Sequence, residues 1–231
     1  MELIKQIAED INNFIFLGGA GSGKSEIAIN FAKCLSDSES KEVHFFDMDM
    51  TKPLFRSRDL RPKIEHMGII FHYEEQFMDA PTLVGGVNRF LRDESCYVVM
   101  DIGGDYIGAR SIGGFAPALN NENTIAYYVL NAYRPWSYDI KHIDQTLGDI
   151  LGVSHIHLEH LHLINNPNVG PDTTAQDFLK GSEWMTKTMS AYQPIDFSCV
   201  KKELYEEVKN LIDEPVMPIN LYLTYPWINY P

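Results

Sequence analysis

Basic residues are scarce in this sequence. Its 231 residues include 19 lysines and arginines against 32 aspartates and glutamates, which gives a formal net charge of −13. Binding to a nucleic-acid backbone needs clustered positive charge, so this balance argues against a large nucleic-acid interface. It does not exclude a nucleotide, because nucleotide phosphates need only one lysine, main-chain N–H groups and a metal ion.

Cysteines and long apolar runs are also few. Cys34, Cys96 and Cys199 are far apart and form no C-x-x-C pair, so neither disulfides nor a thiolate metal site is expected. No apolar run reaches the ~20 residues that a membrane-spanning helix needs, and residues 1–13 lack the apolar stretch of a signal peptide. With 45% hydrophobic and 22% charged residues, the composition predicts a soluble, cytoplasmic globular protein.

Short β-rich runs alternate with segments of helical periodicity. Most of these runs are apolar throughout, as expected for strands covered on both faces. The predicted strands span residues 13–17, 42–47, 68–73, 96–101, 124–131, 161–166 and 194–199, and the predicted helices span 24–36, 82–93, 137–151, 172–190 and 201–213. The alternation predicts an α/β fold, a mostly parallel sheet of about seven strands with helices on both faces. We expect one domain over 1–231, with an aromatic and proline-rich tail over about 214–231.

A glycine-rich segment between the first predicted strand and the first predicted helix carries the strongest signal. Residues 18–25, GGAGSGKS, fit the phosphate-loop (P-loop) pattern G-x-x-x-x-G-K-[ST] in the context that the motif requires. Glycine lets the main chain approach phosphates, and N–H groups at a helix start lack partners within the helix. Lys24 is expected to reach the β- and γ-phosphates, and Ser25 to bind Mg²⁺. The predicted nucleotide-binding residues here are Gly18, Gly19, Ala20, Gly21, Ser22, Gly23, Lys24, Ser25 and Glu26.

An acidic residue ends another apolar strand. Asp101 closes the run CYVVMD and is followed by Gly103 and Gly104. A carboxylate at this position holds Mg²⁺ through water, and the two glycines let main-chain N–H groups approach the γ-phosphate. We therefore predict Asp101 as a metal-side residue and Gly103 and Gly104 as nucleotide-binding residues.

Together with these motifs, the segment EVHFFDMDMTKP resembles a known family. A strand that ends in D-x-D before a proline, between a P-loop and a D-x-G-G-like acid, is similar to the MinD/ParA and CobQ/CobB group of P-loop ATPases. That group belongs to the class of signal-recognition GTPases and dethiobiotin synthetase. The resemblance covers residues 10–185 in architecture but only four short segments in residues. It implies Mg-ATP as ligand, Asp49 as the residue that orients the attacking water, and Asp47 in a supporting or metal-side role, so that Lys24, Asp49 and Asp47 are the predicted catalytic residues.

Two later strand ends are candidates for contacting the base. One holds Asn131 with Arg134, and the other holds Asn165 with Asn166. Guanine-binding relatives carry N-K-x-D at the second position, whereas this chain has NNPN without a carboxylate. The resemblance therefore favours ATP over GTP.

The family's signature lysine is absent from the loop. In MinD/ParA proteins it stands five residues before the invariant lysine and reaches across a nucleotide-sandwich dimer, but the corresponding residue here is Gly19. An arginine of the run FRSRDLR (Arg56, Arg58 or Arg61) is a candidate to replace it. The alternative is that this basic run forms a solvated, charge-balancing face.

Four histidines, His155, His157, His160 and His162, lie close together in the sequence. Imidazole is a good ligand for zinc, nickel or copper. Residues two apart in a strand share a face, so His155 with His157, or His160 with His162, would form half a site. Glu159 is the nearby carboxylate, and a polar edge strand without metal is the alternative.

These observations leave four functions open. The first is an Mg-ATP-binding ATPase switch with slow hydrolysis that acts on a protein partner, with homodimerisation as a further expectation. The second is an ATP-dependent small-molecule enzyme, a kinase or carboxylate-activating enzyme similar to dethiobiotin synthetase and CobB relatives. The third is a metallochaperone that uses the histidines. The fourth is a nucleotide-binding regulatory module without turnover, which differs from the first only in its kinetics. We carry the first forward as the main prediction.

Overall fold

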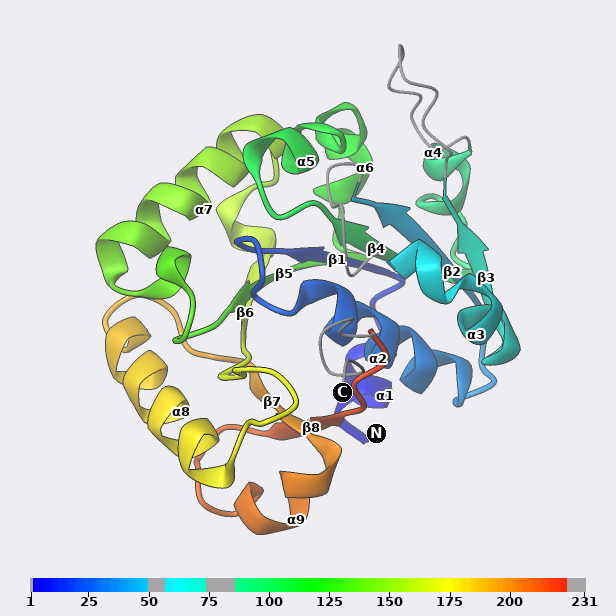
Figure 1. Cartoon of the computed structure of the whole chain (residues 1–231). Coiled ribbons are helices and arrows are strands. Elements are labelled where there is room, and N and C mark those ends of the chain that lie inside the picture. Colours follow the sequence, from blue (N-terminus) through cyan, green and yellow to red (C-terminus); the bar gives the residue numbers. More distant parts are fainter. Residues whose placement is uncertain (1, 50–56, 74–85, 224–231) are drawn as a thin grey trace.

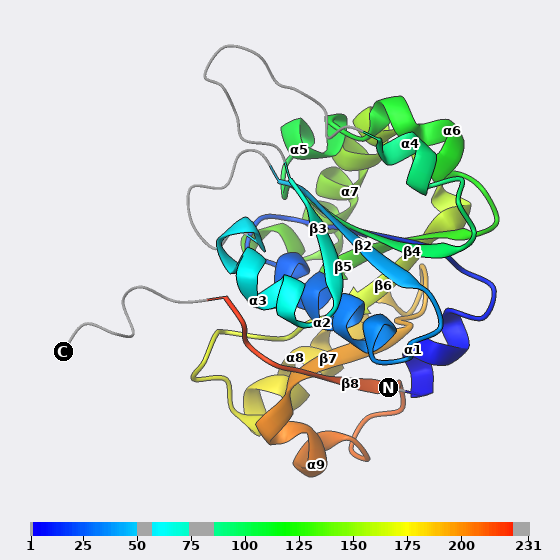
Figure 2. The same cartoon turned by 90° about the vertical axis from the view of Figure 1, so that its right-hand side faces the viewer.

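The computed structural model describes residues 2–49, 57–73 and 86–223. Within these ranges, eight strands form one sheet in the order β3-β2-β4-β1-β5-β6-β7-β8, and every neighbouring pair is parallel (Figures 1 and 2). The strands are β1 (Asn13–Leu17), β2 (Glu42–Met48), β3 (Ile69–His72), β4 (Cys96–Ile102), β5 (Thr124–Leu130), β6 (Leu161–Asn165), β7 (Phe197–Lys201) and β8 (Val216–Ile219). The predicted parallel α/β sheet is confirmed.

The eighth strand was missed by the sequence prediction. β8 lies inside the predicted tail, and residues 224–231 of that tail are outside the described part. The strand is short and contains Pro218, which lacks an N–H group and is tolerated in strands at sheet edges. Met217 and Ile219 are buried, so the strand covers the edge of β7 with one apolar face.

Helices cover both faces of the sheet (Figure 2). They are α1 (Glu2–Ile7), α2 (Lys24–Ser36), α3 (Arg61–His66), α4 (Val87–Phe90), α5 (Tyr106–Arg110), α6 (Ala116–Leu119), α7 (Ile140–Ser154), α8 (Ala175–Met189) and α9 (Tyr205–Val208). None of these helices is long and apolar enough to cross a membrane.

Side chains of β1 alternate between two apolar cores. Phe14 and Phe16 pack with α1, α2 and α3, and the rings of Phe14 and Phe31 are 4.7 Å apart. Ile15 and Leu17 pack on the opposite face with residues of α5, α6, α7 and α8. The strand is buried throughout, because both faces of this central strand are covered.

Caps explain why two helices start later than predicted. The Asp139 side chain accepts a hydrogen bond from the N–H of His142, so α7 begins at Ile140. Thr174 and Asp177 form a reciprocal capping box, so α8 begins at Ala175. Both caps satisfy N–H groups that have no partner within the helix.

The predicted helix over 201–213 is mostly absent. A 3₁₀ turn (Lys202–Leu204) and α9 occupy its first half, and the residues after Val208 form turns. Val208 is the buried residue of α9, so little apolar surface is available to stabilise a longer helix. Of the predicted helix 82–93, α4 is the helical part among the described residues.

Candidate functional site

The P-loop (residues 18–25) follows β1 and starts α2. Gly18 and Gly23 have φ angles of 135° and 99°, a region that residues with a Cβ rarely adopt. Gly23 is the N-cap of α2 and offers no side-chain cap. The N–H groups of the first turn therefore remain available to an anion.

The functional side chains of the loop lie in a protected position. Lys24 and Ser25 are each 2% exposed. The Lys24 ammonium donates a hydrogen bond to the Gly19 carbonyl oxygen at 3.1 Å. The loop thus holds the lysine folded across its own turn, close to where the motif places phosphates.

Two carboxylates lie on adjacent strands beside the loop. Asp47 of β2 and Asp101 of β4 are register partners, and both are buried. Because all strands are parallel, their carboxyl ends meet the P-loop at one edge of the sheet, the carboxyl edge.

Asp101 has the features of a metal-side residue. Its Oδ2 accepts a hydrogen bond from the buried Ser57 hydroxyl at 2.7 Å. Among the described residues, none donates a hydrogen bond to the other oxygen, Oδ1. An unpaired buried carboxylate oxygen needs a partner, and oxygen ligands such as these and the Ser25 hydroxyl suit Mg²⁺. The residues present therefore fit this ion. Ser57 was missed by the sequence prediction, which considered only its arginine neighbours.

Asp49 lies next to Asp47 at the same edge. Its N–H donates to Asp47 Oδ1 at 3.0 Å, and its side chain is buried. A Cβ built on Gly103 would be 3.2 Å from Asp49 Oδ1, which places this carboxylate against the turn between β4 and α5. Asp47, Asp49 and Asp101 therefore lie at the same edge of the sheet.

Gly104 brings the same turn against the P-loop. A Cβ at this position would lie 2.8 Å from Ala20 Cα and 2.9 Å from Lys24 Nζ. Main chain therefore approaches the loop and its lysine where any larger residue would collide.

The segment after β5 contacts the P-loop from another side. The Arg134 Nε donates to the Gly21 carbonyl oxygen at 2.9 Å, and its Nη1 donates to the Tyr133 carbonyl oxygen at 3.1 Å. Arg134 is thus placed on the loop backbone rather than at a base edge. A Cβ on Gly19 would be 2.7 Å from Trp136 Cδ1. The indole therefore covers the position where relatives carry the signature lysine. This contact of Trp136 was missed by the sequence prediction, and its one local signal is an aromatic residue after a strand end.

The predicted asparagines have different surroundings. Asn166 donates to the Ser22 carbonyl oxygen at 2.8 Å and so contacts the P-loop. Asn165 is fully buried and donates to the hydroxyls of Ser182 and Ser198, so it lies in the core and is not positioned to contact a base.

Asn131 organises the backbone near the site. Its amide donates to the Asn168 carbonyl oxygen at 2.9 Å, and its Oδ1 accepts from the Tyr133 N–H at 2.9 Å. The first bond joins the turn after β5 to the loop after β6, and the second lies within that turn. The side chain therefore shapes the region expected to surround a base.

The Glu26 carboxylate faces the C-terminal part of the chain. It accepts hydrogen bonds from the N–H groups of Tyr222 and Leu223. Burial raises the pKa of Glu26 to about 7, although these hydrogen bonds and Lys63 act in the opposite direction. A contribution of Glu26 to nucleotide binding is therefore left to its main-chain N–H group.

The arginine candidates receive no support. Arg61 is exposed, and its Nε donates to Glu65 Oε1 at 2.7 Å within α3. Arg61 thus belongs to a solvated charged face. Arg56 and the side chain of Arg58 lie outside the described residues.

The prediction that the histidine pairs share a strand face is wrong. α7 continues to Ser154, His155 caps it with a φ of 57°, and residues 158–160 form a 3₁₀ turn, so β6 begins only at Leu161. His162 is the histidine within that strand, and its Nδ1 lies 2.7 Å from Asp196 Oδ2, a hydrogen bond that raises the pKa of His162. His157, Glu159 and His160 instead gather in the turn.

Comparison with known families agrees with this geometry. The sequence pattern of the CobQ/CobB/MinD/ParA nucleotide binding domain matches residues 14–157, which include the P-loop, the D-x-D segment and Asp101. The chain belongs to this family. The family is described as a nucleotide binding domain. A search of curated protein sequences finds no match.

Solved structures support the fold. FtsY, a cell division protein from Thermotoga maritima, superimposes with a TM-score of 0.52 at 16% identity, over 86% of this chain and 68% of its own. The signal recognition particle 54 kDa protein from Aeropyrum pernix, in complex with GDP, gives 0.51 at 16% identity, over 85% of this chain and 45% of its own. The receptor FtsY from Elizabethkingia anophelis, also with GDP, gives 0.51 at 12% identity, over 86% and 64%. The chain thus has the α/β P-loop fold and spans about half to two thirds of the length of these proteins.

Proposed function

We propose that this protein binds Mg-ATP, hydrolyses it slowly, and uses the nucleotide state to control attachment to a protein partner, either a second copy or another chain. The observation that carries the proposal is the contact between the β4–α5 turn and the P-loop at Gly104, beside the Lys24 ammonium. A γ-phosphate held by Lys24 would be next to the main chain of this turn. Its presence or loss would therefore act on α5.

Each residue of the site has a distinct role in this proposal. The P-loop N–H groups and Lys24 bind the phosphates, and Ser25 and Asp101 hold Mg²⁺, with Asp47 beside them. The ion, when bound, neutralises charge on the phosphate oxygens. Asp49 orients a water for attack on the γ-phosphate, because it is the carboxylate that faces the β4–α5 turn.

The surface beside the loop is suited to a partner. Tyr106 and Ile107, in the first turn of α5, are 56% and 53% exposed, and Trp136 and Tyr138 are 45% and 68% exposed. Large exposed apolar side chains close to a nucleotide site favour a contact that depends on the nucleotide. The partner surface in this proposal consists of these four residues.

Adenine is favoured by the loop after β6. Asn168 stands where guanine-binding relatives have the aspartate of N-K-x-D, and its Oδ1 accepts from the Gly170 N–H at 2.6 Å and the Thr173 hydroxyl at 3.1 Å. Asn168 has an amide in place of the carboxylate that guanine needs, and its amide oxygen already accepts these two hydrogen bonds. Two of the solved structures named above, from Aeropyrum pernix and Elizabethkingia anophelis, contain GDP, so the comparison of ATP with GTP is part of the test.

Calorimetry and turnover assays test the proposal together. The parent protein is expected to bind Mg-ATP more tightly than Mg-GTP and to release phosphate slowly. Asp49→Asn should keep the ATP affinity within about twofold and lower the turnover by about a hundredfold, the scale for loss of a positioned carboxylate. Asp37→Asn, which changes an exposed aspartate at the far end of α2, should change neither.

Two results would contradict the proposal. Absence of Mg-ATP binding by the folded protein would remove the function altogether. Normal turnover in Asp49→Asn would show that this residue does not orient the attacking water.

A binding assay tests the attachment to a partner. The Asp49→Asn protein loaded with ATP should retain a second chain that the ADP form releases, and the substitution Ile107→Asp should abolish this retention.

A further inference from the structure

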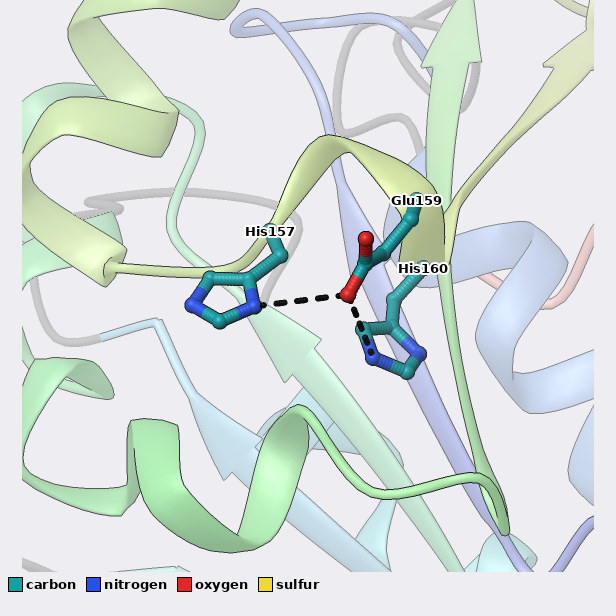
Figure 3. A group of neighbouring side chains, drawn as sticks. All are labelled: His157, Glu159 and His160. Carbon is teal, nitrogen blue, oxygen red and sulfur yellow. Dashed lines mark ion pairs between the residues drawn. The ribbon is translucent and has the colours of Figure 1, made fainter.

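The turn that precedes β6 places two imidazoles on one side. His157 is the N-cap of the 3₁₀ turn Leu158–His160, and the His160 N–H donates to the His157 carbonyl oxygen at 3.0 Å. Residues three apart in 3₁₀ geometry eclipse one another, so the backbone itself aligns His157 with His160. Figure 3 shows both rings and the Glu159 carboxylate directed toward one another.

The spacing of the three side chains suits a metal ion. His157 Nδ1 lies 3.6 Å and His160 Nε2 lies 3.9 Å from Glu159 Oε1, and all three ligand atoms are within 4.8 Å of one another. Ligand atoms about 2.1 Å from a tetrahedral ion are roughly 3.4 Å apart. Small side-chain rotations would therefore bring all three atoms to coordination distance.

The turn is held by a residue from outside it. Asn120, which follows α6, accepts a hydrogen bond from the His157 N–H at 2.8 Å and donates to the His155 carbonyl oxygen at 2.9 Å. This bracket fixes the backbone on which the histidines stand. His160 is 17% exposed in its side chain, whereas His157 and Glu159 are 64% and 76% exposed, so an ion from solvent has open access.

We propose that His157, Glu159 and His160 form a binding site for a divalent transition-metal ion, with Zn²⁺ as the expected ion and water as the fourth ligand. Two imidazoles and one carboxylate suit Zn²⁺, whereas Mg²⁺ prefers oxygen ligands alone. The site precedes β6 and so lies at the amino edge of the sheet, opposite the P-loop. It is independent of the nucleotide function proposed above.

Metal titration of the full chain, purified without a histidine tag, tests the site. Calorimetry with Zn²⁺ and absorption spectroscopy with Co²⁺ are performed in excess Mg²⁺, which occupies the oxygen ligands near the P-loop. One ion per chain is expected, with the visible absorption of Co²⁺ in a four-coordinate nitrogen and oxygen environment. His157→Ala and His160→Ala should each weaken Zn²⁺ binding by about tenfold or more, and Glu159→Gln should also weaken it.

Matched controls separate the site from general histidine binding. His155→Asn keeps a residue that tolerates the left-handed backbone of the same segment, and His66→Ala removes an exposed histidine on α3. Both should leave the Zn²⁺ affinity within about twofold of the parent. Added Zn²⁺ should raise the melting temperature of the parent and of both controls, but not of a His157→Ala/His160→Ala double variant.

The proposal would be overturned by either of two results. One is a folded double variant that binds Zn²⁺ as tightly as the parent. The other is a parent that binds no Zn²⁺ at concentrations up to about 100 μM, far above the dissociation constant expected for a preformed Zn²⁺ site. The far-UV circular dichroism of the double variant checks that it is folded.

Discussion

The P-loop is approached from one side by main chain and from the other side by large side chains. At the β4–α5 turn, Gly104 lies so close to the loop that a Cβ on it would collide with Ala20 and the Lys24 ammonium. On the opposite side, Arg134 and Asn166 bond to loop carbonyl oxygens, and Trp136 covers Gly19. The side without side chains, the bare side, leaves space where we propose that phosphates bind, whereas the bonds from Arg134 and Asn166 hold the loop in shape. One loop thus combines an open binding surface with a rigid support.

Loss of the lysine on the bare side is expected to have the largest effect. Lys24→Ala should weaken Mg-ATP binding by about a hundredfold or more, since it removes charged hydrogen bonds worth roughly 3 kcal/mol. Lys33→Ala, which removes a lysine paired with Asp37 near the end of the same helix, should leave binding unchanged. Calorimetry measures both. Equal affinities for the parent and Lys24→Ala would mean that the bare side is not the phosphate site.

A second prediction concerns Glu26 of α2, whose carboxylate accepts hydrogen bonds from the N–H groups of Tyr222 and Leu223. Its pKa is about 7 in the folded protein against 4.5 ordinarily, so the folded state holds a proton that the unfolded state releases between these values. The contribution of Glu26 to the free energy of unfolding should therefore be largest below pH 4.5. It should fall by up to about 3 kcal/mol as the pH rises to 7. Glu26→Gln removes the titration, so the curve should be flatter over this window.

Urea unfolding at several pH values measures this effect. The variant Glu65→Gln serves as the control, because it breaks an ion pair with Arg61 that is exposed to solvent. Its free energy of unfolding should vary with pH as in the parent. If Glu26→Gln showed the same fall in stability between pH 4.5 and 7 as the parent, another group would be responsible.

The two sides of the loop should also differ in what an added methyl group meets, main chain on one side and a side chain on the other. Gly104→Ala places a Cβ against main-chain atoms of Ala20 and should destabilise by about 1–3 kcal/mol. Gly19→Ala places it 2.7–2.8 Å from Cδ1, Cβ and Cγ of Trp136, at the base of that side chain, and should also destabilise by about 1–3 kcal/mol. Trp136→Ala removes Cδ1 and Cγ but keeps Cβ, so it should reduce the cost of Gly19→Ala and leave that of Gly104→Ala unchanged. A thermal or urea double-mutant cycle measures this, and equal rescue of both glycine variants would show that the sides do not differ in this way.

Several elements followed directly from local sequence. The strand 13–17 and helix 24–36 were predicted with the bounds that the structure shows, because an apolar run, a glycine turn and a helical pattern are adjacent. Asp47, Asp49 and Asp101 were singled out as site residues from their positions at strand ends, and parallel strands end at one edge of a sheet. The prediction of a helix over 201–213 was wrong and strand 216–219 was missed, because the stability of both segments depends on the neighbours they pack against.

The partners of several site residues had no local signal. Asn165 and Asn166 are adjacent and chemically identical, yet one lies in the core and the other bonds to the P-loop. Successive side chains leave a strand end in different directions, and only the surrounding elements decide which direction meets the loop. In the same way, the Glu26 carboxylate faces the N–H groups of Tyr222 and Leu223, nearly the whole length of the chain away.

The sequence by itself determined that the chain makes a phosphate-binding loop between a strand and a helix in a parallel α/β sheet, because glycine freedom, a lysine and apolar periodicity act over a few residues. Tertiary structure decided which side chains surround that loop and that the Glu26 carboxylate binds the N–H group of Tyr222. It also decided that His157, Glu159 and His160 share a turn and not a strand. These outcomes depend on contacts between residues far apart in the chain, whose geometry is set only when the sheet and its helices pack together.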